Sequence, residues 1–137
     1  MPTLPPFPLR PEVRVHLERV GLDFLAEFLE CVTRRDPGNL EALAELAHVL
    51  TKLGRTEEGL AADRRLVVLA PHNPTVHYNL ACSLSLLGRN RPALDALARA
   101  VELGYDDVDH LLEDSDLVGL HAETRFQDLV DQLRSSA

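Results

Sequence analysis

The chain repeats itself at one fixed interval, and this interval limits the folds open to it. LTKLGRTEEGLAA begins at Leu50 and LSLLGRNRPALDA begins at Leu84, and we call this step the repeat period. Pro37, Pro71 and Tyr105 follow one another at the same period. Self-similarity of this kind indicates stacked supersecondary units, because one unit alone cannot bury its apolar face and neighbouring units can.

The residue pattern inside each unit predicts a helical hairpin. In the first unit, apolar residues recur at spacings of three and four, as on one face of a helix: Leu43, Leu46, Ala47, Leu50 and Leu53. Gly54 suits the left-handed turn after this helix, Thr56 is the predicted N-cap of a second helix, and Pro71 ends it. Gly88 and Asn90 are predicted to play the same roles in the second unit.

These units resemble the tetratricopeptide repeat, a helix–turn–helix motif of about 34 residues. The matching residues of the second unit are Tyr78, Asn79, Leu80, Ala81, Gly88, Ala93 and Ala100. The first unit departs from the pattern at Gly59, where a small Ala is usual, and at Asp63, where a bulky residue is usual. Gly59 costs about 1 kcal/mol of helix propensity against Ala, so we interpret it as a point of close helix–helix contact.

The resemblance implies an all-α fold, a right-handed α-solenoid of stacked antiparallel hairpins with about three repeats and a C-terminal cap. We expect a degenerate first hairpin, two full repeats, and acidic capping helices in which Asp114, Asp116 and Leu117 form a turn. A Pro-rich leader precedes them. The expected boundaries are 1–10 for the leader, 11–39, 40–73 and 74–107 for the hairpins, and 108–137 for the cap.

The composition excludes several classes of protein. The net charge is −8, and most of this excess lies after Leu103, so we expect no nucleic-acid partner, because binding nucleic acid needs a basic face. We predict no transmembrane segment, because no apolar run approaches the length of about 18 residues that indicates a membrane span. The two cysteines are too few for a disulfide framework, and the prolines near the N-terminus oppose a signal peptide. We therefore predict a cytoplasmic protein, and the preference for Arg over Lys suggests a bacterial one.

No motif of a known catalytic type occurs in the sequence. His48 and Cys82 lie one repeat apart, which raises the alternatives of a metal site or a nucleophilic Cys82. Two ligands are too few for structural zinc, and nothing supplies the third group of a catalytic triad. The prediction is therefore a protein that is not an enzyme, with no cofactor and no metal.

The predicted binding surface is the concave groove lined by the first helix of each unit. The resemblance implies that this groove binds a peptide or helix of another protein. By repeat register, the candidate peptide-binding residues are His48, Lys52, Tyr78, Asn79 and Cys82. These residues do not match the basic clamp that heat-shock co-chaperones use for a C-terminal carboxylate.

Two other functions stay open at this point. One is a chaperone of the type III secretion translocator kind, which holds an extended client segment. The other is a self-assembling structural subunit, so a homodimer is also left open. The leader PTLPPFPLRP is expected to be a ligand for a groove, a dimer arm, or a stiff segment that packs Phe7 and Leu9 on the first helix or stays disordered.

Overall fold

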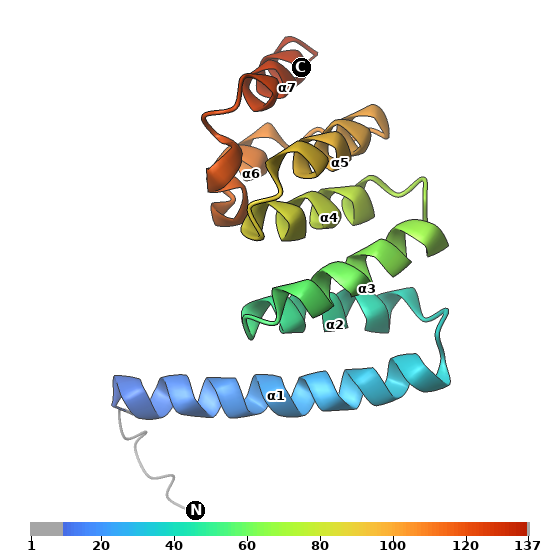
Figure 1. The fold of residues 1–137 in the computed structure, drawn as a ribbon, viewed down its shortest axis with the longest axis vertical. Coiled ribbons are helices and arrows are strands. Elements are labelled where there is room, and N and C mark those ends of the chain that lie inside the picture. The colour runs from blue at the N-terminus through green and yellow to red at the C-terminus, as the bar shows by residue number, and fades with distance from the viewer. Residues whose placement is uncertain (1–9, 137) are drawn as a thin grey trace, which may run out of the picture.

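A computed structural model describes residues 10–136, and across them the chain forms a curved stack of helices with no strand (Figure 1). The elements in chain order are α1 (Pro11–Arg35), α2 (Leu40–Lys52), α3 (Thr56–Leu69), α4 (Pro74–Leu86), α5 (Asn90–Glu102), α6 (Val108–Glu113), the 3-10 helix η1 (Ser115–Leu120) and α7 (Thr124–Ser135). The predicted fold class, an α-solenoid of helical hairpins, is confirmed. The predicted leader, apart from Arg10, lies outside the described residues.

Helices α2 with α3 and α4 with α5 form the two predicted hairpins. Their first helices begin one repeat period apart, at Leu40 and Pro74, and their second helices begin at Thr56 and Asn90. Gly54 and Gly88 follow the first helix of each hairpin with φ of +79° and +72°. This left-handed conformation is open to glycine at little steric cost, so the predicted turns are confirmed.

The predicted N-caps of the second helices are wrong by one residue. Thr56 and Asn90 are the first helical residues, and Arg55 and Arg89 occupy the cap positions without a capping side-chain bond. The Arg55 side chain instead pairs with Glu58 at 2.6 Å and with Glu30 of α1 at 3.0 Å. These ion pairs join the turn to the helices on either side of it.

The predicted hairpin over residues 11–39 is also wrong, because Pro11–Arg35 is one continuous helix. A hairpin there would need its first helix to end near Gly21, yet the φ of Gly21 is not positive and a Cβ there would meet nothing within 4 Å. One exposed glycine costs a helix only about 1 kcal/mol. A bend at Gly21 would give up backbone hydrogen bonds of the continuous helix.

The core is divided into three apolar clusters along the stack. One joins α1 to α2 around Ala26, Leu29 and Leu50. A second joins α2, α3 and α4 around Leu43 and Leu66. The third and largest runs from Leu60 of α3 to the C-terminal helices, and its fully buried members include Leu97, Leu111, Leu117, Leu120 and Phe126. Each hairpin thus packs mainly on its neighbours, as in a solenoid.

The C-terminal elements continue the repeat. Helices α6 and α7 begin at Val108 and Thr124, each one repeat period after α4 and α5 begin. The first helix of this third unit is interrupted at Asp114, whose backbone is extended and whose side chain caps the first turn of η1 by accepting a bond from the Asp116 N–H at 2.9 Å. The region expected to be a solvated acidic cap therefore occupies the position of a third hairpin.

Candidate concave pocket

The inner faces of α2 and α4 and the junction between α6 and η1 enclose one cavity of about 330 Å³, here called the inner pocket. Its lining residues are Ala44, Ala47, His48, Thr51, Asp63, Tyr78, Asn79, Cys82, Ser83, His110, Asp114 and Asp116. Four of the five residues predicted from register, His48, Tyr78, Asn79 and Cys82, line it together. Lys52 is exposed at the last position of α2 and does not line the pocket.

Tyr78 is held in place by the third unit of the same chain. Its hydroxyl donates a hydrogen bond to the Asp114 carboxylate at 2.6 Å. Its ring stacks on Tyr105 with 4.5 Å between centroids, and the His110 ring lies 5.5 Å away. Burial and the bond to Asp114 both raise the pKa of the Tyr78 hydroxyl, so it stays protonated and continues to donate.

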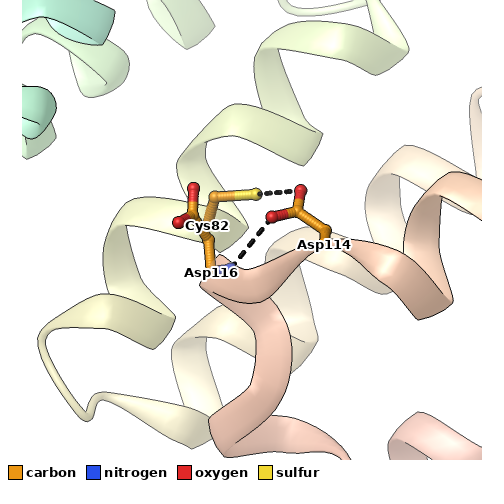
Figure 2. A group of neighbouring side chains, drawn as sticks. All are labelled: Cys82, Asp114 and Asp116. Carbon is orange, nitrogen blue, oxygen red and sulfur yellow. Dashed lines mark hydrogen bonds between the residues drawn. The ribbon is translucent and has the colours of Figure 1, made fainter.

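Cys82 donates to the same carboxylate oxygen, with 3.6 Å between its Sγ and Oδ2 of Asp114 (Figure 2). Burial is the main reason that the pKa of the Cys82 thiol is raised, and the charges of Asp114 and Asp116 raise it further. A thiol whose pKa is raised is a poor nucleophile, because the thiolate is the reactive form. His48 is not its hydrogen-bond partner, so the geometry supplies no base for a nucleophilic role.

Asp114 links the second hairpin to the third unit with both of its oxygens. Oδ1 accepts the Asp116 N–H of the η1 turn, and Oδ2 accepts from Tyr78 and Cys82 of α4. The imidazole of His110 also lies 3.6 Å from Oδ2. Asp114 therefore already engages the polar atoms of Tyr78 and Cys82, two of the predicted peptide-binding residues.

Two further carboxylates make the pocket acidic. Burial and the neighbouring charge of Asp114 raise the pKa of Asp116, and His48 partly offsets this. Asp63 of α3 is only 3% exposed and accepts a hydrogen bond from the Ser83 hydroxyl. Burial raises the pKa of Asp63 to about 6, and the Ser83 bond opposes that shift. Within residues 10–136, no Arg or Lys lies within ion-pair distance of these three carboxylates.

The ligand atoms of Cys82, Asp114 and Asp116 lie within 4.8 Å of one another, so we tested whether they fit a metal ion (Figure 2). Both oxygens of Asp114 already accept bonds from the protein. Three ligands also fall short of the four of a structural zinc site. The group is therefore an incomplete ligand set for a structural metal.

Sequence reasoning missed Asp63, His110, Asp114 and Asp116 as pocket residues, although a signal for one of them was present. Asp116 lies one repeat period after Cys82, which lies one period after His48. The three therefore hold equivalent repeat positions on the inner wall. The period is hard to follow past Tyr105, because the signature Leu-Ala pair of the second unit becomes Asp114 and Ser115 in the third.

The fold and pocket together define a tetratricopeptide-like solenoid of two complete hairpins and a modified third unit. No family model matches the chain. Among solved structures, the chain is similar in fold to the crystal structure of MamA, with a TM-score of 0.69 and 18% sequence identity. The match covers 94% of this chain and 75% of MamA. At this identity the likeness describes the fold alone. No helix within residues 10–136 is long and apolar enough to cross a membrane.

Proposed function

We propose that this protein is a non-catalytic interaction module whose inner pocket holds a basic side chain, Arg or Lys, of a partner protein. The observation that most supports this proposal is that Asp63, Asp114 and Asp116 border one cavity whose lining contains no Arg or Lys. The proposal refines the register-based prediction of a peptide-binding groove, because the third unit adds two acids, Asp114 and Asp116, that were not assigned to it.

The pocket suits a cation in size and in electrostatics. A volume of about 330 Å³ admits one long side chain rather than a folded domain. The carboxylate of Asp116 is destabilised by burial and by Asp114, and a bound guanidinium or ammonium group relieves both effects. A hydrogen bond between charged groups contributes about 1.5–3 kcal/mol, enough to make this side chain the anchor of a larger contact.

The His110 ring and the rim supply the rest of the recognition. The exposed His110 ring, which lines the pocket, offers apolar contact to the methylene stem of the bound side chain. Asn79 and His48 line the same pocket and can bond the backbone of an extended segment. Lys52 lies outside the pocket and is proposed as a rim contact to an acidic residue of the partner.

The proposal also places the protein in the cytoplasm. Cys31 and Cys82 are both free thiols, and free thiols are typical of a reducing compartment.

The test is a titration of the isotopically labelled protein with peptides that differ at one central position, Arg, Lys, Gln or Glu. We expect Arg and Lys peptides to shift the amide signals of Tyr78, Cys82 and Asp116, and Gln and Glu peptides to leave them in place. Added salt weakens the binding, since the contact is between charges.

The matched variants are Asp116→Asn in the pocket and Asp109→Asn, an exposed acid of α6 outside it. We expect Asp116→Asn to weaken binding of the Arg peptide by about tenfold or more, since a charge-assisted bond of about 1.5–3 kcal/mol corresponds to at least that factor. We expect Asp109→Asn to change the affinity little. Equal affinity for Arg and Gln peptides, or equal loss in both variants, overturns the proposal.

A further inference from the structure

Helix α1 carries a second apolar face that no other element within residues 10–136 covers. Leu22, Leu25, Ala26 and Leu29 pack it against α2. On another side, Leu17, Val20, Phe24 and Phe28 are 52%, 51%, 73% and 57% exposed. The N-terminal part of α1 also extends past the end of α2 (Figure 1).

These residues form one continuous stripe and not scattered exposed positions. At about 100° per residue, Val13, Leu17, Val20, Phe24, Phe28 and Cys31 fall within an arc of about 80°, and we call this set the α1 stripe. The set repeats after 11 residues, since Val13 and Phe24, Leu17 and Phe28, and Val20 and Cys31 are each separated by that interval. A period of about 11 residues keeps a stripe nearly straight along a helix, so it suits pairing with another long helix.

The size of the α1 stripe calls for a partner. A phenylalanine side chain buries about 150–250 Å², so Phe24 and Phe28 at their observed exposure offer on the order of 250 Å². That is about a third of the roughly 800 Å² per partner in a standard interface. Single exposed apolar residues are normal on a protein surface. Leu17 and Val20, each about half exposed, extend the area of the two rings toward the few hundred Å² above which contiguous apolar patches mark contact sites.

We propose that the α1 stripe is the interface of an antiparallel homodimer of this chain. The stripe is self-complementary about a twofold axis next to Gly21. Antiparallel pairing on that axis places Leu17 against Phe24 of the second copy and Val13 against Phe28 of the second copy, so each aromatic ring meets an aliphatic side chain. Gly21 has nothing within 4 Å of a Cβ position, which lets the two backbones approach closely at the axis.

The polar residues along one border of the stripe agree with the antiparallel orientation, because an imidazole N–H can donate a hydrogen bond to a carboxylate. His16 lies on this border in the N-terminal half of α1, and Glu27 lies on the same border in the C-terminal half. In an antiparallel pair of helices, equivalent borders meet, so His16 faces Glu27 of the second copy across the axis. In a parallel pair, His16 lies level with His16 of the second copy and Glu27 lies level with Glu27, so His16 and Glu27 do not face each other. The dimer does not depend on the inner pocket.

The first measurement is the molar mass of the full chain by light scattering over a series of concentrations. We expect a monomer–dimer equilibrium that Phe24→Asp abolishes while helicity by circular dichroism is unchanged, because Phe24 belongs to none of the three core clusters. The matched control is Val68→Asp on α3, a single residue 79% exposed and away from the stripe, which should leave the dimer intact.

Cysteine cross-linking then tests the orientation in a Cys31→Ser background. A mixture of Leu17→Cys and Phe24→Cys chains should form a mixed disulfide dimer, whereas each chain alone should form little. Cross-linking of each chain with itself would indicate parallel pairing and overturn the proposed geometry. A chain that stays monomeric throughout, or a dimer that survives Phe24→Asp, overturns the interface. A monomer that dimerises after removal of residues 1–9 would show that the leader covers the stripe instead.

Discussion

At the scale of single residues, Asp63 is the clearest case of a side chain whose chemistry depends on its neighbours. It stands at a repeat position that is usually bulky and apolar, yet it is buried and accepts one hydrogen bond, from Ser83. Its equivalent in the second hairpin is Leu97, which is fully buried in the core. A buried carboxylate with a single hydroxyl partner is destabilised in its charged form. The charged Asp63 in the pocket wall therefore lowers the stability of the folded protein.

The raised pKa of Asp63 predicts a specific dependence of stability on pH. In the folded protein its pKa is about 6, and its ordinary value is 3.8. Between these values the folded state binds more protons than the unfolded state, so stability falls as pH rises through this window. Asp63→Asn removes the charge, and we expect it to be more stable than the native chain at pH 8, by about 1–3 kcal/mol.

Thermal unfolding at pH 4, 6 and 8 measures this effect. The advantage of Asp63→Asn should shrink as pH falls below 6 and be nearly absent at pH 4, where the native Asp63 is protonated in the folded state. Asp109→Asn, an exposed position, serves as the control and should show no such trend. A difference between Asp63→Asn and the native chain that is constant with pH would contradict the assigned cause.

At the scale of elements, Gly59 sets how closely α3 packs on α2. A Cβ at Gly59 would lie 2.8 Å from Oγ1 of Thr51 and 3.2 Å from the carbonyl oxygen of Ala47. The hydroxyl of Thr51 bonds that same carbonyl at 3.0 Å. The interpretation of Gly59 as a close helix–helix contact is therefore confirmed, and the glycine offsets its weak helix propensity by allowing this approach.

Substitution at Gly59 should separate the two helices of the first hairpin. We expect Gly59→Leu to destabilise the protein by about 1–3 kcal/mol despite its better helix propensity, because overpacking forces the backbones apart. Ala61→Leu, on the exposed side of α3, should change stability by less than about 0.5 kcal/mol. Urea unfolding followed by circular dichroism compares them, and equal losses would show that α3 faces α2 differently.

The third unit shows how a short sequence change redirects an element. Asp107 begins α6 as an N-cap, with its side chain accepting the His110 N–H at 3.0 Å. Asn39 and Asn73 cap α2 and α4 at the equivalent positions. Where those helices continue, Asp114 starts a new turn, because aspartate favours capping its own local backbone over helix interiors. At this break between α6 and η1, Asp114 and Asp116 line the inner pocket.

At the scale of the whole molecule, the division of the core into three clusters implies that stability is local along the stack. Ala26 and Leu29 serve the contact between α1 and α2, whereas Leu97 belongs to the cluster shared by the C-terminal elements. In a solenoid each unit contacts its neighbours only, so removing a core side chain should loosen the adjacent helices first.

Hydrogen exchange measured by mass spectrometry can test this locality. We expect Leu29→Ala to raise exchange in α1 and α2 and to leave α5 and α7 near their native protection. Leu97→Ala should have the reverse distribution and the larger effect, about 2–5 kcal/mol as for other Leu→Ala changes in cores. Uniform loss of protection in both variants would indicate that the stack unfolds as a single cooperative unit.

The sequence by itself determined the hairpins, their turns at Gly54 and Gly88, and the close contact at Gly59, because each follows from the local chemistry of a repeated pattern. Register also identified His48, Tyr78, Asn79 and Cys82 as inner-wall positions. The repeat register gave a wrong prediction of a hairpin over residues 11–39, because no local signal there distinguishes a broken helix from a continuous one. Tertiary structure alone decided that Asp114 accepts from Tyr78 and Cys82, residues 36 and 32 positions earlier in the chain. That contact forms only when the third unit stacks on the second, because polar groups that are buried together need hydrogen-bond partners.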